Sequence, residues 1–127
     1  MAIASFIAGE AISAGDVVYV SPSGLLLKSI ATSFVQAAAV GVATNAGAAG
    51  SLISVNSDSI QTGFTSLTPG DFQYLSATTS GSLVTYSSWA GQLAATTLSG
   101  LFLSPVGRAL TTTSVEIELA PPTYIIK

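Results

Sequence analysis

One eight-residue segment occurs twice in this chain, and the repetition constrains the fold more than any other feature. Residues 14–21 are AGDVVYVS and residues 69–76 are PGDFQYLS, so Gly, Asp, Tyr and Ser recur at the same spacing. In both segments a Gly-Asp turn leads into a short stretch whose apolar residues alternate, which is typical of a β-strand. We therefore expect the same turn and strand to form twice.

The segments that follow also correspond, although the spacing between them differs. Three further pairs match: 24–27 (GLLL) with 81–84 (GSLV), 40–43 (VGVA) with 106–109 (VGRA), and 51–55 (SLISV) with 114–118 (SVEIE). Loops of unequal length explain the drift in spacing. We interpret the chain as one β-rich unit used twice. Copy one covers about residues 9–58 and copy two about residues 65–119.

Short apolar segments separated by Gly, Pro and Ser turns predict an all-β fold. The 127 residues fit a single domain, residues 1–127, large enough for a hydrophobic core. We expect a small antiparallel β-barrel or sandwich built from the two copies, with little or no helix. Residues 31–39 are predicted to be a loop or a helical turn. The two copies differ most at residues 87–100, which are predicted to be a long loop.

The composition excludes several classes of function. Charged residues make up only 7% of the chain, against roughly 25% in an average soluble protein, so neutral surface is available for contact with other proteins. The net charge is −3 and the three basic residues are isolated, which argues against a nucleic-acid partner. No apolar run approaches the roughly 20 residues that span a bilayer, so no membrane partner is expected. Residues 1–10 lack a basic start, and no signal peptide is predicted.

The chain offers little catalytic chemistry, because it contains neither His nor Cys. We expect no enzyme, no catalytic, cofactor-binding or metal-binding residues, and no cofactor. Asp16 and Asp71 occupy matching positions, and a pseudo-two-fold axis would let them share a proton; turn capping is the role we expect instead. Asn56 and Asp58 carry oxygens that suit a hard cation, but their spacing is that of an ordinary turn.

Apolar segments flank the repeated region, at residues 1–8 and 120–127. Pro121 and Pro122 cannot donate ladder hydrogen bonds and are predicted to end the sheet. The apolar tail beyond them is expected to dock on its own domain or on a neighbouring subunit. The candidate contacts with other subunits or with a capsid are Ile3, Phe6, Ile7, Trp89, Tyr124, Ile125 and Ile126.

The repeated Gly-Asp turn and strand, the VG-A strand that follows each, and the alternating last strand, residues 115–119, resemble the small β-rich capsid decoration (cement) proteins of tailed bacteriophages. The resemblance covers most of the chain and departs at residues 87–100 and 121–127. It implies a structural virion protein without catalytic activity. Such a homotrimer lies on the outer capsid surface near local three-fold axes and stabilises the head by bridging subunits of the major capsid protein.

Two other hypotheses remain open at the level of sequence. The first is a carbohydrate-binding or receptor-binding module of a phage tail fibre or baseplate, in which Trp89 and the tyrosines stack on sugar rings. Against it, aromatic side chains more often fill a core or a subunit interface. The second is an enzyme that uses the Asp16 and Asp71 pair.

Overall fold

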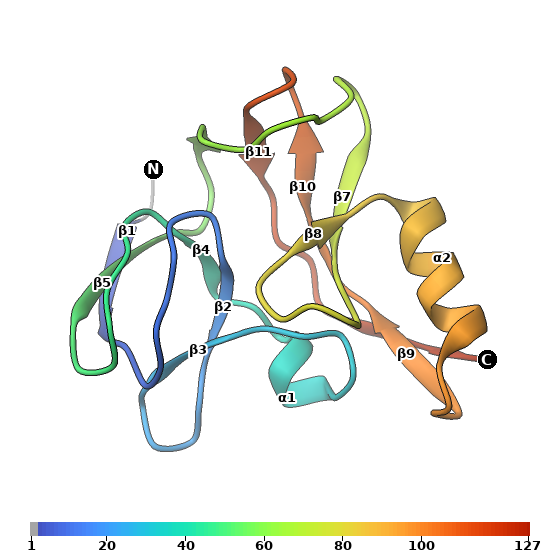
Figure 1. Ribbon diagram of the computed structural model, residues 1–127, viewed down its shortest axis with the longest axis horizontal. Helices are drawn as coiled ribbons and strands as arrows, with labels where there is room; N and C mark the ends of the chain where they lie inside the picture. Colours follow the sequence, from blue (N-terminus) through green and yellow to red (C-terminus); the bar gives the residue numbers. More distant parts are fainter. Residues whose placement is uncertain (1–2) are drawn as a thin grey trace.

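The computed structural model describes residues 3–127, which form an all-β fold with two helices (Figure 1). The first half contains β1 (Ile3–Ile7), β2 (Val17–Val20), β3 (Leu26–Lys28), α1 (Phe34–Ala37), β4 (Gly41–Ala43) and β5 (Leu52–Asn56). The second half contains β6 (Ile60–Gln61), β7 (Phe72–Leu75), β8 (Leu83–Val84), α2 (Tyr86–Ala95), β9 (Gly100–Leu103), β10 (Pro105–Ala109), β11 (Val115–Ile117) and β12 (Thr123–Ile126).

Both halves have the same strand order, which confirms the internal repeat. The first sheet runs β3-β2-β4-β5-β1 and the second runs β8-β7-β10-β11-β6, each with antiparallel neighbours. β9 and β12 form an additional two-stranded ribbon that has no counterpart in the first half. The sheets pack in a sandwich-like arrangement, and the described residues do not form a closed barrel.

The turns that begin each copy are held by equivalent backbone hydrogen bonds. Gly15 N donates to Ala43 O at 2.8 Å, and Gly70 N donates to Ala109 O at 2.7 Å. Both glycines have a left-handed backbone, with φ of 93° and 91°, which Gly adopts without steric cost. The repeated Gly-Asp pair thus marks the same turn in both copies.

The predicted match of the last strands is wrong in its register. Ala43 lies opposite Val55 and Ala109 opposite Val115, so Val55 corresponds to Val115, whereas the sequence match paired Leu52 with Val115. A hydrogen bond from Thr44 N to Ser54 O has its equivalent between Leu110 N and Ser114 O. A short alternating segment fits another at several offsets, and only the partner strand fixes the register.

The two copies share one hydrophobic core. Its buried residues are Val17, Ala31, Ala37 and Val42 of copy one and Leu75, Ala77, Trp89, Leu101, Val106, Val115 and Ile117 of copy two. A second, smaller cluster lies within the first half and contains Val18, Leu26, Ile53 and Val55. Because the larger cluster draws on both sheets, each sheet buries part of its apolar surface against the other.

The helices fulfil one prediction and correct another. α1 is the helical turn that residues 31–39 allow, and Ser33 caps it by accepting a hydrogen bond from Gln36 N. Residues 87–100, predicted to be a loop, instead contain most of the ten-residue helix α2, whose N-cap is Thr85. Neither helix, within residues 3–127, has the length and apolarity needed to cross a membrane.

Candidate interaction surfaces

The N-terminal segment forms β1, at the edge of the first sheet. Phe6 is half-buried and packs against the smaller hydrophobic cluster, whereas Ile7 is exposed and lies opposite exposed Leu52. Ile3 begins the strand opposite Asn56. Residues 1 and 2 lie outside the described part of the chain. Ile7 is therefore more accessible to a partner than Phe6.

The C-terminal tail docks on its own chain, which is one of the two predicted alternatives. After Pro121 and Pro122 it forms β12, which pairs with β9 along residues 123–126. Ile125 packs against the shared core, while Tyr124 lies over Phe102 with 5.1 Å between ring centroids. Lys127 Nζ donates to Thr96 O, and Ser99 Oγ lies 3.1 Å from Tyr124 Oη.

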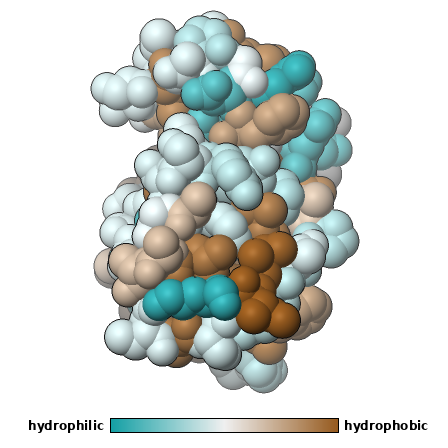
Figure 2. All heavy atoms as spheres, turned by 90° about the vertical axis from the view of Figure 1, so that its right-hand side faces the viewer, coloured by the Kyte–Doolittle hydropathy of each residue, from teal (hydrophilic) through white to brown (hydrophobic). Residues whose placement is uncertain are grey.

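The outer side of this ribbon is apolar and exposed. Ile126 retains 76% of its accessible surface, and Tyr124 and Leu98 are also exposed. Figure 2 faces the side of the molecule that bears α2, β9 and the C-terminus, and apolar side chains gather on the lower half of this face. The terminal residues predicted to be contacts therefore do present apolar surface, at Tyr124 and Ile126.

Trp89 is not a surface residue, which corrects its place among the candidate contacts. It lies in α2, it is only 1% exposed, and it packs in the shared core. Its indole Nε1 donates a hydrogen bond to Phe102 O at 3.0 Å. The physical reason is that α2 covers the second sheet and turns its largest side chain inward. Trp89 offers no face for a sugar ring or a partner protein.

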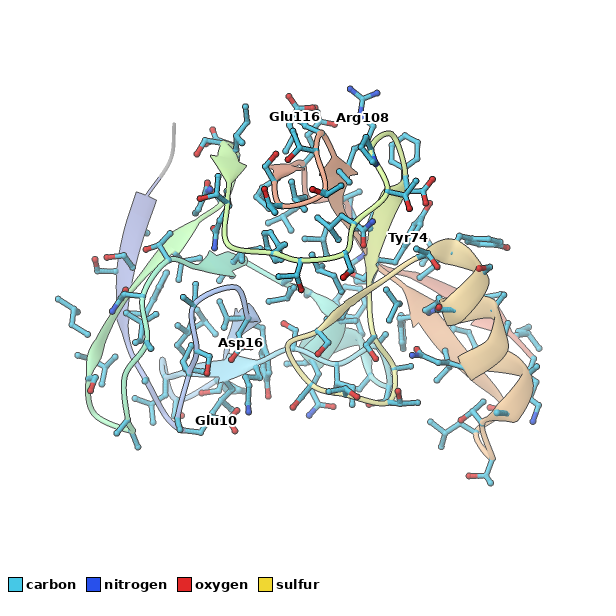
Figure 3. All side chains as sticks on the ribbon, turned by 45° about the horizontal axis from the view of Figure 1, so that its top comes forward. Glu10, Asp16, Tyr74, Arg108 and Glu116 are labelled. Carbon is cyan, nitrogen blue, oxygen red and sulfur yellow. The ribbon has the colours of Figure 1, made fainter. Side chains whose placement is uncertain are left out.

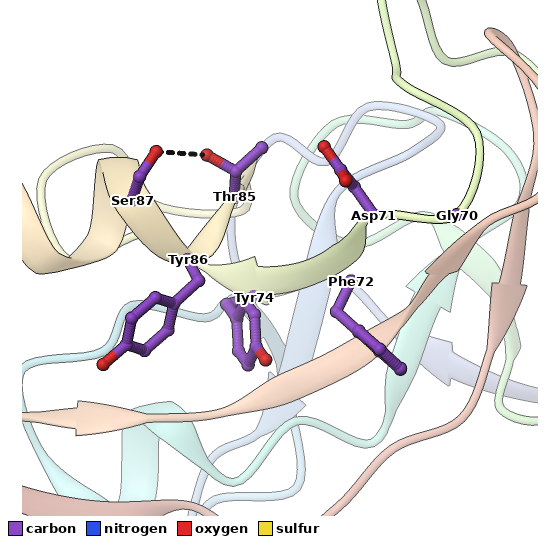
Figure 4. A pocket seen from close by; sticks show the side chains of 7 residues that line it. All are labelled: Gly70, Asp71, Phe72, Tyr74, Thr85, Tyr86 and Ser87. Carbon is purple, nitrogen blue, oxygen red and sulfur yellow. Dashed lines mark hydrogen bonds between the residues drawn. The ribbon is translucent and has the colours of Figure 1, made fainter.

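A hollow of about 400 Å³ lies at the start of β7, and no sequence feature singled it out. It is lined by Gly70, Asp71, Phe72, Tyr74, Thr85, Tyr86 and Ser87 (Figure 4). Phe72 and Tyr86 are both exposed. Tyr86 is held by ring contacts with Tyr74, at 5.9 Å between centroids, and with Trp89, at 6.0 Å. Of the lining residues, Ser87 belongs to residues 87–100, the segment in which the two copies differ most.

Asp16 and Asp71 do not form a catalytic pair. Asp16 Oδ2 accepts a hydrogen bond from Ser13 N at 2.9 Å, which is the predicted turn-capping role. The two carboxylates line different hollows on the molecule.

The other polar candidates have structural partners. Asn56 Oδ1 accepts hydrogen bonds from Asp58 N and Ser59 N, which closes the turn predicted there. Arg108 and Glu116 lie across from each other on β10 and β11 with 4.0 Å between charged atoms (Figure 3). Within residues 3–127 no three acidic side chains gather as metal ligands would.

The sequence matches no protein-family model and no curated protein. The case for a function therefore depends on the surfaces described above.

Proposed function

We propose that this protein is a structural virion protein that decorates the outer surface of a phage head. It stabilises the head by bridging subunits of the major capsid protein, and it acts as a homotrimer. The observation that carries the proposal is the exposed apolar surface of the terminal segments, above all Ile126 and Tyr124 on the C-terminal ribbon. Contiguous apolar surface outside a completed core is typical of a protein–protein contact.

The scarcity of charge supports the same function. With 3 Lys+Arg and 6 Asp+Glu in the chain, the surface is largely neutral and suits burial against other proteins more than permanent exposure. The resemblance of the repeated motifs to decoration proteins supports the choice of a capsid as the partner.

The mechanism is stabilisation by mass action. A protein that binds the assembled shell, and not its dissociated subunits, lowers the free energy of the shell by its binding free energy. Each trimer presents three equivalent contact surfaces, so weak single contacts add up to avidity on a symmetric lattice. Catalysis plays no part in this mechanism.

Co-sedimentation with head shells that lack the protein tests the proposal. We expect saturable binding with a simple ratio of bound copies to major capsid subunits, because a symmetric shell offers equivalent sites everywhere. Binding of a few copies per shell, or of none, would remove the proposed function.

Deleting residues 123–127 is expected to reduce shell occupancy at least tenfold. The deletion removes Tyr124 and Ile126 from the proposed contact, and a loss of about 1.4 kcal/mol of binding free energy already corresponds to a factor of ten. The same co-sedimentation assay measures the effect. Because β12 pairs with β9, the deletion also strips a strand, so Ile126→Ser and Tyr124→Ser provide the variants that keep the backbone pairing. Unchanged occupancy in all three variants would remove the ribbon from the contact.

The carbohydrate-binding hypothesis is weaker than it was from sequence, because Trp89 was its best stacking residue and is buried. We do not propose it.

A further inference from the structure

The hollow in copy two has an equivalent position in copy one. The strand pairings align Tyr74 with Tyr19 and Val84 with Leu27. Extending this register, the lining residues Gly70, Asp71, Phe72, Tyr74, Thr85, Tyr86 and Ser87 correspond to Gly15, Asp16, Val17, Tyr19, Lys28, Ser29 and Ile30. The four positions from Gly70 to Tyr74 are equivalent in the two copies, whereas residues 85–87 begin α2 and residues 28–30 of copy one are not helical.

In copy one this position is filled by the hairpin turn of copy two. Gly81 O accepts a hydrogen bond from Val17 N at 2.8 Å, and Gly81 N donates to Ser29 O at 2.7 Å. A Cβ placed on Gly81 would lie 3.1 Å from Asp16 Cγ, so only Gly approaches this closely without displacing a neighbour. Gly81 is buried as a result.

The equivalent turn of copy one does not dock on copy two: its Leu25 lies beside Gly9 of the same copy, and its Gly24 has no such neighbour. Gly24 corresponds to Gly81 and shares its left-handed backbone, with φ of 84° against 79°. A Cβ placed on Gly24 would have no non-neighbouring atom of the described chain within 4 Å. Residues 22–25 are all exposed. The contact between the copies is therefore not reciprocal, as it would be under a two-fold axis: a turn is docked beside Asp16, none is docked beside Asp71, and the turn around Gly24 is undocked.

The two turns differ in length, but both end in a Gly with the same backbone conformation. Residues 77–81 of copy two replace residues 22–24 of copy one, and the Gly in each case directly precedes the return strand segment. The beginning of the longer turn is held by α2, where Gln92 Oε1 accepts a hydrogen bond from Ala77 N at 2.8 Å. The additional residues therefore serve contacts within copy two, and the shorter turn keeps the Gly in its place.

We propose that the free turn of one molecule, residues 21–25, docks in the open hollow of a second copy of this chain. Gly24 takes the place beside Asp71 that Gly81 takes beside Asp16. The surfaces match in chemistry: exposed Pro22 and Leu25 meet exposed Phe72 and Tyr86, and the turn carries no charge. The contact is head-to-tail, and such a contact gives a ring when its rotation closes and a filament when it does not; the trimer of the proposed function requires the ring. The inference deepens the self-association in the proposed function, where a ring of three copies contains six repeat units.

Engineered cysteines test this contact, because the natural chain contains no Cys. Ser23→Cys beside the free Gly and Asp71→Cys in the hollow are combined in one chain. After mild oxidation we expect covalent dimers and trimers on a non-reducing gel, since in copy one Gly81, the residue after the equivalent of Ser23, lies beside Asp16. Ser23→Cys combined with Thr112→Cys, an exposed site outside the hollow, is the matched control and should give at most dimers. Equal cross-linking of both pairs, or none of either, overturns the proposal.

A charge placed in the hollow provides a second measurement that does not depend on disulfide geometry. Phe72→Asp sets a second carboxylate beside Asp71, and we expect the mass in solution to fall to that of one chain, measured by light scattering. Ile60→Asp is the matched control, since Phe72 is 58% exposed and Ile60 is 57% exposed on strands of the same sheet. A natural chain that is already a monomer, or a Phe72→Asp variant that keeps its oligomer, overturns the proposal.

The failure of this contact can be told apart from failure of the proposed function. If the natural chain is a monomer that still coats head shells, the decoration function stands and the ring is contradicted. If the chain forms a cross-linked ring that does not bind shells, the ring stands and the decoration function is contradicted.

Discussion

Replacing Trp89 with alanine is expected to lower the free energy of unfolding by about 3–5 kcal/mol. Trp89 is 1% exposed and contributes the largest buried side chain to the cluster that both copies share. Truncation removes its apolar contacts and leaves a cavity between α2 and the second sheet, which close-packed neighbours fill only in part. It also removes the donor to Phe102 O, a carbonyl that is then left without this partner.

Urea unfolding followed by far-ultraviolet circular dichroism measures this loss, because the chain has 1 Trp and fluorescence would vanish with it. The free energy of unfolding of Trp89→Phe should lie between those of the natural chain and Trp89→Ala. We expect a loss of about 1–3 kcal/mol, because an aromatic ring remains while the hydrogen bond is lost. Phe34→Ala is the control: Phe34 touches Phe102 only edge-on and is largely exposed, so we expect a change below about 1 kcal/mol. Equal urea midpoints for Trp89→Ala and Phe34→Ala would contradict the role of Trp89 in the hydrophobic core.

This prediction changes how a sugar-binding experiment must be designed. A loss of glycan binding in Trp89→Ala would report partial unfolding, because the indole presents no surface. Tyr86 is the exposed aromatic residue of the same helix, and Tyr86→Ala addresses a surface without emptying the core.

The repeat was predictable from sequence because its marks are local. A Gly-Asp turn needs a left-handed residue at one position, and Gly15 and Gly70 supply it at the same place in both copies. The alternating strands after the turns follow from their period of two. The last strands were misaligned because alternation alone does not fix a register, and the residues that decide it, Ala43 and Ala109, lie on another strand.

The candidate site was much less predictable, for a different physical reason. α2 is short, and Ser87, Ser88 and Gly91 lower its helix propensity, although Tyr86, Trp89, Ala90 and Leu93 do follow the i, i+3, i+4, i+7 spacing of an amphipathic helix. This spacing and the N-cap Thr85 were the local signals of the helix. Because residues 87–100 are predicted to be a loop, the sequence places Trp89 at the surface. The open hollow could not be predicted from the sequence either. It is recognised only by comparison with copy one, where the turn around Gly81 docks at the equivalent position.

Replacing Gly107 with alanine is expected to cost about 3 kcal/mol or more, the upper end of what overpacking costs in a rigid core. Gly107 lies in β10, between β11 and β7. A Cβ at this position would lie 2.1 Å from Glu116 O and 3.0 Å from Val115 Cγ1. The nearest atom is backbone of a paired strand, so relief requires β10 and β11 to separate and to lose ladder hydrogen bonds.

The same close approach occurs in copy one, where a Cβ on Gly41 would lie 2.5 Å from Asn56 O. The VG-A motif therefore marks a strand position at which only a residue without a Cβ lets the neighbouring strand pair. Gly41→Ala should be destabilising for the same reason, and we expect the double variant Gly41→Ala/Gly107→Ala not to fold.

Gly91→Ala is the matched control, because it makes the same chemical change where a Cβ meets nothing within 4 Å in the described chain. Gly91 lies inside α2, where alanine is favoured over glycine by about 0.5–1 kcal/mol. The two substitutions should therefore move the urea midpoint in opposite directions. If Gly107→Ala unfolded at the midpoint of the natural chain, β10 and β11 would have to tolerate a methyl group between them. The packing described for the second sheet would then be wrong.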